Sequence, residues 1–401
     1  MKQQCDVVVV GGAGHVGAPL SIVLASRGIR TLIHDLNEQS LSLLRAGQMP
    51  FREDGAEPML KSALSRGLLE FSSNPASIAG VPVVIVTIGT PIDEFQNPSV
   101  SLLTLCMDTL MPYLSDDQLI VLRSTVAPGV TEYLATYLKA CGKEPLLAFC
   151  PERVVQGKGV EEIQALPQLV SGTTREAFDR AAALFSKIAP EVVELSPKEA
   201  EYAKLISNAY RYIQFAATNQ FYMMVEADGL DYNRLLDKMK HHYDRMSSFP
   251  RAGFAAGPCL MKDTMQLAAF KKHAFMLGQV AMTINEGLPD YLVSRLVRET
   301  TIRGKTVGIL GMAFKAESDD IRDSLSYKLK KILEFQGAIV CCSDEYVRDD
   351  TFLTKEELLL KSEVLVVGVP HAAYREVRTA PGQIVLDVWG VLPQSLPDMT
   401  A

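Results

Sequence analysis

The sequence predicts an α/β protein with two doubly wound parallel-sheet domains joined by a helical central domain that contains a long helix. Three observations support this prediction. Short apolar runs alternate with helical segments through the first half of the chain, a proline-free helical stretch covers residues 199–228, and the alternation returns after residue 306. A chain of 401 residues is long enough for two or three domains. We place their boundaries at residues 1–196, 197–298 and 299–401.

The first element is an apolar strand over residues 6–10, which runs into a glycine-rich turn and a helix over residues 18–27. The turn reads G-x-G-x-x-G, and its candidate cofactor-binding residues are Gly12, Gly14, His15, Val16 and Gly17. In this context the glycines permit a tight turn and let the backbone approach a pyrophosphate, which the helix N-terminus then binds. The pattern is typical of a Rossmann-like dinucleotide-binding domain. A glycine turn in an unrelated α/β protein is the alternative.

A second strand over residues 31–34 ends at Asp35. An acid about 20 residues beyond the glycines is expected to bind the cofactor's ribose hydroxyls. Because an acid at this position repels a 2′-phosphate, NAD is favoured over NADP. A helix-capping role is the alternative for Asp35. Thr90, which follows a strand over residues 81–87, is expected near the nicotinamide half of NAD, with a plain turn residue as its alternative.

The remaining elements follow in order. Strands are expected at residues 118–123, 146–150, 168–171, 192–195, 306–310, 338–343, 364–369 and 384–387. Between them the apolar spacing becomes helical and predicts helices over residues 199–228, 231–240 and 264–286. A long helix between two α/β domains commonly also forms a dimer seam, and a structural spacer would look the same. From this helix we expect a homodimer.

Composition excludes several classes of partner. The net charge is -7, the pI is near 5.5, and no basic run is long enough to indicate nucleic-acid binding. No apolar stretch is long enough to span a bilayer. The seven cysteines have no paired metal-binding spacing and no signal peptide precedes the first strand. We therefore expect a cytoplasmic protein with no metal, nucleic-acid or membrane partner.

A thiol stands beside an ammonium and a carboxylate in the segment over residues 257–263, which contains Cys259, Lys262 and Asp263. These groups suit covalent aldehyde chemistry. A thiolate adds to an aldehyde, a hydride acceptor oxidises the resulting thiohemiacetal to a thioester, and water cleaves the thioester. The dinucleotide would supply the hydride acceptor. An inert, buried cysteine is the alternative.

Lys204 and Asn208 lie four residues apart in the predicted long helix and therefore share one face of it. An ammonium and an amide donor on one face can stabilise an oxyanion or alkoxide at a reacting carbon. A solvated lysine with a surface asparagine is the alternative.

Seven segments in chain order resemble the nucleotide-sugar 6-dehydrogenases, the UDP-glucose/GDP-mannose dehydrogenase family, and the resemblance covers essentially the whole chain. These segments are residues 12–17, 89–91, 123–129, 151–153, 201–208, 257–263 and 314–324. The resemblance implies an NAD-binding N-terminal domain, a central domain for dimerisation and catalysis, and a nucleotide-sugar-binding C-terminal domain. It also implies a four-electron oxidation of the sugar 6-hydroxymethyl to a uronic acid, with two NAD and one water.

The same resemblance assigns the site residues. The implied catalytic set is Cys259, Lys204, Asn208, Asp263, Thr125 and Glu152. Asp263 would act as a base or orient the hydrolytic water, Thr125 and Glu152 would contact that water, and Thr125 would also contact NAD. The alternative for Asp263 is a helix N-cap, a role that is compatible with the catalytic one. Thr125 could simply close a strand, and Glu152 could simply pair with Arg153.

The implied substrate-binding set is Glu152, Arg153, Lys204, Asn208, Arg245, Arg251, Gly257, Lys315 and Arg322. Lys315 and Arg322 resemble diphosphate contacts. Arg245 resembles an arginine that reaches the sugar site of the partner subunit, with Arg251 as a competitor. Surface salt bridges are the alternative for Lys315, Arg322 and Arg245. Two departures stand out: alanines enter the loop over residues 253–257, and Gln156 replaces a glutamate common in UDP-glucose enzymes.

Two kinds of sugar remain candidates for the substrate. Residues 151–155 with 166–168 resemble UDP-N-acetylhexosamine enzymes, particularly those for N-acetylmannosamine, whereas residues 262–264 resemble UDP-glucose enzymes. A two-electron β-hydroxyacid or 6-phosphogluconate-type dehydrogenase is a second hypothesis, since it needs no thiol. A catalytically inactive nucleotide-sugar-binding homologue is the third.

Overall fold

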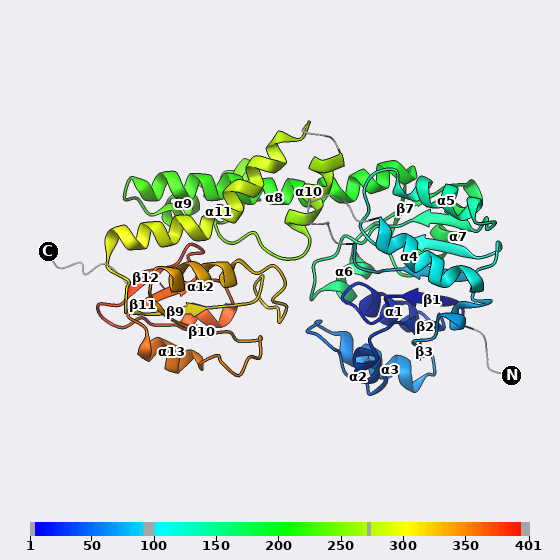
Figure 1. Ribbon diagram of the computed structural model, residues 1–401, viewed down its shortest axis with the longest axis horizontal. Helices are drawn as coiled ribbons and strands as arrows, with labels where there is room; N and C mark the ends of the chain where they lie inside the picture. The colour runs from blue at the N-terminus through cyan, green and yellow to red at the C-terminus, as the bar shows by residue number, and fades with distance from the viewer. Residues whose placement is uncertain (1–4, 91–99, 271–273, 394–401) are drawn as a thin grey trace. The chain divides into compact units, whose positions relative to one another are not determined.

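The protein is described by a computed structural model that covers residues 5–90, 100–270 and 274–393 (Figure 1). It divides into two compact units. The N-terminal unit comprises Met1–Ser207 with Ala269–Lys272, and the C-terminal unit comprises Asn208–Ala268 with His273–Ala401. Pro91, in one of the predicted motifs, lies outside the described residues.

An eight-stranded sheet forms the centre of the N-terminal unit, in the order β3-β2-β1-β4-β5-β6-β7-β8. The strands are β1 (Val7–Val10), β2 (Thr31–His34), β3 (Leu69–Ser72), β4 (Val83–Val86), β5 (Leu119–Leu122), β6 (Leu146–Phe149), β7 (Gln168–Gly172) and β8 (Val192–Glu194). The predicted strands are present, and the fold prediction is confirmed. Two details differ from it. The edge strand β3 was not predicted, and β7 runs antiparallel to β6 in a sheet that is otherwise parallel.

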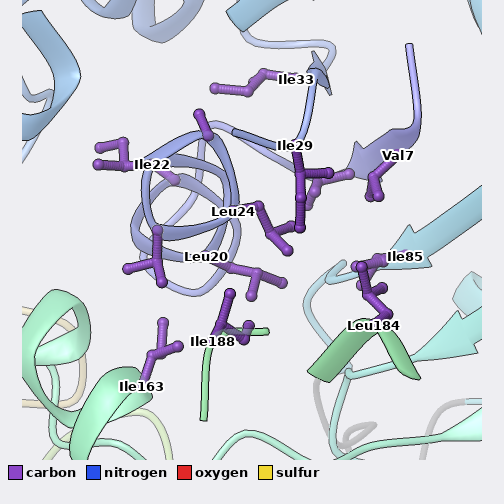
Figure 2. Packing of buried hydrophobic residues seen from close by; sticks show 14 of the residues in the cluster. Val7, Leu20, Ile22, Leu24, Ile29, Ile33, Ile85, Ile163, Leu184 and Ile188 are labelled. Carbon is purple, nitrogen blue, oxygen red and sulfur yellow. The ribbon is translucent and has the colours of Figure 1, made fainter. Parts of the chain in front are cut away.

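Helices cover both faces of this sheet. They are α1 (Gly17–Ser26), α2 (Glu38–Arg45), α3 (Ala56–Ser65), α4 (Ser101–Leu110), α5 (Val130–Ala140), α6 (Gly159–Ala165) and α7 (Arg175–Phe185). Successive side chains of a strand point to opposite faces, so Val7 and Val9 pack in one core and Val8 and Val10 in the other. The first of these cores surrounds α1, which is buried on all sides (Figure 2). This packing fixes the N-terminus of α1 at the end of β1.

The C-terminal unit contains a four-stranded parallel sheet in the order β10-β9-β11-β12. Its strands are β9 (Thr306–Leu310), β10 (Ile339–Ser343), β11 (Val364–Val367) and β12 (Ile384–Leu386). The helices α12 (Leu325–Phe335) and α13 (Lys355–Lys361) lie on opposite faces of this sheet (Figure 1). Val366 packs with the α12 core and Leu365 with the α13 core.

Four further helices are α8 (Pro197–Ala227), α9 (Tyr232–Lys240), α10 (Leu260–Phe270) and α11 (Met276–Glu299). The single helix predicted over residues 264–286 is wrong, because α10 begins earlier and α11 ends later, and residues 271–273 lie outside the described part. Apolar spacing alone did not mark the division, since both helices have the same period. Short 3-10 helices are η1 (Pro75–Ile78), η2 (Met111–Tyr113), η3 (Asp244–Met246) and η4 (Ala372–Glu376). Among the described residues, no helix has the length and apolar character needed to cross a bilayer.

Candidate active site

The glycine loop lies between β1 and α1, where the strand order of the sheet reverses. A Cβ on Gly12 would lie 2.5 Å from the Val9 carbonyl oxygen, and a Cβ on Gly17 would lie 2.5 Å from that of Gly11. Both positions therefore need glycine for the turn itself. Gly14 is exposed, and a Cβ there would meet no atom closer than 3.5 Å. Its outer side is thus open to a pyrophosphate, as the motif requires.

Asp35 is held by the glycine loop. Its Oδ2 accepts a hydrogen bond from the Ala13 N–H at 2.9 Å, and its Oδ1 accepts one from the Asn37 N–H at 2.9 Å. Asn37, not Asp35, caps α2, so the helix-cap alternative is wrong. Each carboxylate oxygen keeps a second lone pair. The geometry therefore suits two ribose hydroxyls.

A cluster around His15 borders the same loop, while Val16 is the N-cap residue of α1. The His15 ring lies 3.9 Å from the Phe51 ring, centroid to centroid, and its Nδ1 lies 3.1 Å from the Gln156 Nε2. Buried Glu53 accepts hydrogen bonds from nearby backbone N–H groups, including that of Gly157 at 3.0 Å. Burial raises the pKa of Glu53. Gln156 is thus a neighbour of the glycine loop.

The ends of β4 and β5 are tied together beside this loop. The Thr90 hydroxyl donates to the Thr125 carbonyl, and the Ser124 hydroxyl donates to the Ile88 carbonyl at 2.7 Å. Thr90 is buried and Thr125 half-buried. Both lie at the carboxyl edge of the sheet, where ligands of such folds bind.

Glu152 forms a buried ion pair with Arg123, and not the predicted alternative pair with Arg153. Its Oε2 accepts from two guanidinium nitrogens of Arg123, and its Oε1 accepts from the backbone N–H groups of Arg153 (2.7 Å) and Val154 (3.0 Å). These four bonds use the four lone-pair sites of a carboxylate. The Arg153 guanidinium donates to the Pro167 carbonyl. A water contact for Glu152, which stays a prediction, would have to displace one of these donors.

Lys204 is half-buried on α8, one turn beyond Glu201. Glu201 is fully buried, and it accepts hydrogen bonds from the Gly129 N–H at 2.5 Å and the Thr131 N–H at 2.8 Å. Burial raises the pKa of Glu201. This carboxyl group fixes the turn that follows Thr125 against the helix that carries Lys204.

Asn208 and Asp263 contact each other in the C-terminal unit. The Asn208 Nδ2 donates to the Asp263 Oδ2 at 2.6 Å, and both side chains are buried. The Asp263 Oδ1 lies 3.4 Å from the Lys262 Nζ and has no hydrogen-bond partner among the described residues. A buried acceptor of this kind fits the orientation of a water molecule. Because α10 begins at Leu260, Asp263 lies inside its first turn, and the N-cap alternative is wrong.

Cys259 is exposed immediately before α10. Its carbonyl accepts the Asp263 N–H at 2.8 Å, which places the thiol-bearing residue one helical turn from the acid. The pKa of Arg322 is raised, first by its hydrogen bond to Asp320 and also by the charges of Asp320, Cys259 and Asp323. The guanidinium of Arg322 forms an ion pair with Asp320 at 2.6 Å, which is the salt bridge expected as the alternative to a diphosphate contact.

Gly257 joins the thiol loop to the segment over residues 314–324. Its N–H donates to the Asp323 carbonyl at 3.2 Å, and its φ is +99°. A Cβ on Gly257 would lie 2.3 Å from the Phe314 ring, so no larger residue fits without movement. Lys315 is half-buried on the same segment. The structure thus brings Gly257, Cys259, Arg322 and this segment together.

The two remaining arginines lie near α9. Arg251 forms an ion pair with Asp237 at 2.5 Å and donates to Asn233 at 3.1 Å. Arg245 is exposed in η3. Substrate roles for both arginines stay predictions.

Sequence reasoning did not assign the buried partners of these groups. Arg123 and Glu201 lie in the segments over residues 123–129 and 201–208, but no role was predicted for either residue. The pair of Asp344 and His371 in the C-terminal unit was not predicted. A usable signal was present for Arg123 and Glu201, because charged residues inside apolar runs must be paired when they are buried.

In the N-terminal unit, a glycine loop and an acid meet where the strand order reverses. In the C-terminal unit, a thiol precedes a buried acid and amide. The first arrangement is that of an NAD-dependent dehydrogenase, and the second leaves an exposed thiol next to a buried acid.

The family models identify which dehydrogenases these are. Three models of the UDP-glucose/GDP-mannose dehydrogenase family match, for the NAD binding domain over residues 6–189, the central domain over residues 198–286 and the UDP binding domain over residues 308–394. The chain belongs to this family, and it is an NAD-dependent nucleotide-sugar dehydrogenase. The family, enzyme class and cofactor predicted from the sequence are thereby confirmed.

Individual relatives match over nearly their whole length. The chain is 26% identical over 381 residues to the UDP-N-acetyl-D-mannosamine dehydrogenase of Pyrococcus horikoshii, covering 92% of this chain and 90% of the relative. It is 24% identical over 411 residues to the NDP-N-acetyl-D-galactosaminuronic acid dehydrogenase of Ralstonia nicotianae, covering 96% of each. The solved structure of the Pyrococcus horikoshii enzyme superposes with a TM-score of 0.89 at 24% identity, covering 97% of this chain and 96% of that one. A UDP-glucose dehydrogenase from Pyrobaculum islandicum gives 0.88 at 24% identity, covering 97% and 95%.

Proposed function

We propose that the protein oxidises the 6-hydroxymethyl group of a UDP-N-acetylhexosamine, with UDP-N-acetylmannosamine as the leading candidate, to a uronic acid. The observation that carries the chemistry is the contact of Asn208 with Asp263, one helical turn from Cys259. The names of the Pyrococcus horikoshii and Methanocaldococcus jannaschii relatives support the sugar. UDP-glucose is the second candidate, since residues 262–264 resemble enzymes of that substrate.

Each residue has a role in this proposal. Lys204 and the second N–H of the Asn208 amide stabilise the alkoxide as the alcohol loses its hydride and proton. The Cys259 thiolate then adds to the aldehyde carbon. After loss of a second hydride, water oriented by Asp263 cleaves the carbon–sulfur bond, which releases the carboxylate and regenerates the thiolate. NAD supplies the hydride acceptor for both oxidations.

The stoichiometry of NADH tests this reaction. UDP-N-acetylmannosamine, UDP-N-acetylglucosamine and UDP-glucose would each be incubated with enzyme and excess NAD, and NADH and uronate measured. We expect two NADH for each uronate formed. One NADH per substrate with no uronate would indicate a two-electron dehydrogenase, and tight binding without NADH would indicate an inactive homologue.

The variant Cys259→Ser tests the covalent step. A hydroxyl of high pKa is a poor nucleophile without an adjacent base, so we expect loss of uronate formation with NAD binding retained. Cys141→Ser is the matched control, because Cys141 is also exposed but lies at the end of α5. Uronate production near the parent rate by Cys259→Ser would contradict the covalent mechanism.

We further propose that the protein is a homodimer that associates through α8. Exposed apolar side chains on this helix are Ile206 (53%), Tyr210 (60%), Phe221 (49%) and Met224 (59%). At 100° per residue these positions fall within about 60° of one another, and so form one stripe. An exposed apolar stripe on a helix commonly marks an interface.

Sedimentation of the variant Tyr210→Glu with Met224→Glu tests the dimer. We expect a dimer for the parent and a monomer for the variant, since two buried charges would destabilise the interface. Leu360→Glu, on α13, is the control, because Leu360 is 89% exposed and lies outside the stripe. A dimeric variant, or a monomeric parent, would contradict this interface.

A further inference from the structure

A pair of buried amides holds the beginning of the loop that leads to Cys259. Asn219, on α8, accepts the Gly253 N–H at 2.8 Å through Oδ1 and donates to the Gly253 carbonyl at 3.0 Å through Nδ2. The same Nδ2 donates to the Asn285 Oδ1 at 2.9 Å, and the Asn285 Nδ2 donates to the Tyr212 carbonyl at 3.0 Å. Neither asparagine has any exposed surface.

The amide of Asn219 therefore bonds both polar groups of Gly253, as a neighbouring strand would. Asn285 in turn fixes which end of the Asn219 amide faces which group. Leaving a buried amide unpaired costs about 1–3 kcal/mol, whereas an apolar pair of the same shape would need no partners. Stability alone thus gives no reason for two asparagines here, but fixing the position of one peptide group does.

The loop between Gly253 and Cys259 is short and is held at two points. At its start, a Cβ on Gly253 would lie 2.4 Å from the Trp389 ring, so the backbone packs directly against the indole. Near its end, Gly257 packs against Phe314 in the same way. Asn219 supplies the side-chain hydrogen bonds at the first point, six residues before the thiol.

We propose that Asn219, oriented by Asn285, is a positioning residue that sets the location of the Cys259 thiol. It does not touch the reacting atoms. This inference rests on the proposed nucleophilic role of Cys259 and adds a residue to it. The step affected is the addition of the thiolate to the aldehyde and the second oxidation that follows, so the first oxidation should proceed at nearly the parent rate.

The test compares Asn219→Ala and Asn219→Asp with Tyr232→Phe. The Tyr232 hydroxyl bonds the Thr218 hydroxyl at 2.6 Å, so this control loses one buried hydrogen bond at the residue next to Asn219 without touching the loop. A misplaced reacting group can cost up to about 100-fold in rate. For the Asn219 variants we expect a fall of about tenfold or more in kcat, with little change in KM for the nucleotide sugar, and parent kinetics for Tyr232→Phe.

The chemical reactivity of the Cys259 thiol gives a second measurement that does not depend on turnover. The rate at which iodoacetamide alkylates Cys259, followed by mass spectrometry of its peptide, reports the environment of the thiol without any reaction. We expect this rate to change severalfold in the Asn219 variants and not in Tyr232→Phe. Uronate formation by Cys259→Ser would contradict the covalent mechanism alone. A changed alkylation rate of Cys259 in the Asn219 variants would still show that Asn219 positions the thiol.

Asn285→Ala provides an independent variant should Asn219→Ala not fold. It removes the partner of Asn219 and leaves the bonds to Gly253 in place, so we expect the same kinetic change in smaller measure. Parent kcat and parent alkylation rates in the folded variants would overturn the inference. An equal loss of kcat in Tyr232→Phe would also overturn it, because the effect would then follow from destabilisation alone.

Discussion

Lys204 has two possible functions that kinetics can separate. It is half-buried on α8, one turn beyond the carboxyl group that fixes the turn after Thr125. If its ammonium stabilises the oxyanion in both oxidations, Lys204→Ala should lower kcat by about 100-fold, the usual cost of losing one preorganised donor. KM for the nucleotide sugar should change little. Steady-state kinetics with the sugar varied at saturating NAD measures both quantities.

Lys198→Ala is the control for this prediction, because Lys198 is an exposed lysine in the first turn of the same helix. It should keep the parent kcat and KM. A Lys204→Ala enzyme that retains turnover at saturation but needs more substrate would show that Lys204 binds the diphosphate and does not stabilise the reacting oxygen.

At the scale of residues, the sequence predicted the acids better than their partners. Asp35 could be located because its distance from the glycine motif is set by one strand–helix–strand unit. The partner of Glu152 could not, since Arg123 lies 29 residues away and reaches it across neighbouring strands. Ion pairs across a sheet depend on register, which local spacing does not contain.

The backbone conformation and packing of the loop at Gly257 exclude a larger residue there. Its φ of +99° and the Phe314 ring 2.3 Å from a Cβ position both oppose a larger residue. Gly257→Ala should therefore displace the loop and lower kcat/KM by about tenfold or more, on the scale of a misplaced reacting group. Steady-state kinetics at a temperature well below Tm measures this loss.

Gly229→Ala separates backbone strain from loop displacement. Gly229 also has a positive φ, +73°, in the same unit, but a Cβ there would meet nothing within 4 Å. This control should lose about 1–2 kcal/mol of stability from strain and keep its kcat/KM. Equal kinetic losses in both variants would show that the contact with Phe314 has no part in the effect.

At the scale of elements, strands buried on both faces were the most predictable, because each of them consists of a short, continuous apolar run. The edge strand β3 alternates Leu69 and Phe71 with polar residues and pairs with a strand on one side alone, so it gave a weaker signal. The direction of β7 could not be predicted either. Composition determines that a strand forms, whereas the path of the preceding chain determines which way it runs.

At the scale of the molecule, the two sheets use the same acid position differently. Gly11 follows β1 and Asp35 follows β2, and in the second sheet Gly311 follows β9 and Asp344 follows β10. Both glycines have positive φ. Asp35 keeps capacity for a ligand, but Asp344 is engaged internally. Its Oδ2 accepts the Met312 N–H at 2.6 Å and lies 3.2 Å from the His371 Nε2.

His371 connects this acid to the segment that carries Lys315. Its Nδ1 accepts the Glu317 N–H at 3.0 Å, so the Nε2 must carry the proton that faces Asp344. Glu317 has a positive φ of 55°, which is strained for a residue with a side chain. In the second sheet, the acid at this position therefore supports the segment predicted to bind the diphosphate.

This support makes the stability of the protein sensitive to acid. Burial opposes ionisation of Asp344, but hydrogen bonds from His371 and from the backbone outweigh it and lower the pKa from 3.8 to about 2. A lowered native pKa contributes stability that is present above pH 3.8 and is lost as the pH falls toward 2. A shift of this size corresponds to about 2 kcal/mol. The contribution should therefore be complete at pH 5 and nearly absent at pH 2.

Denaturant unfolding of the parent and Asp344→Asn between pH 5 and pH 2 checks this expectation. Because many carboxyl groups titrate in this range, the useful quantity is the difference in unfolding free energy between the two proteins. That difference should shrink by about 2 kcal/mol as the pH falls. Asp350→Asn, at an exposed position nearby, should show no comparable change. A difference that stays constant across the range would mean that Asp344 has the same pKa in the folded and unfolded chains, and that its contacts with His371 and Met312 do not stabilise the carboxylate.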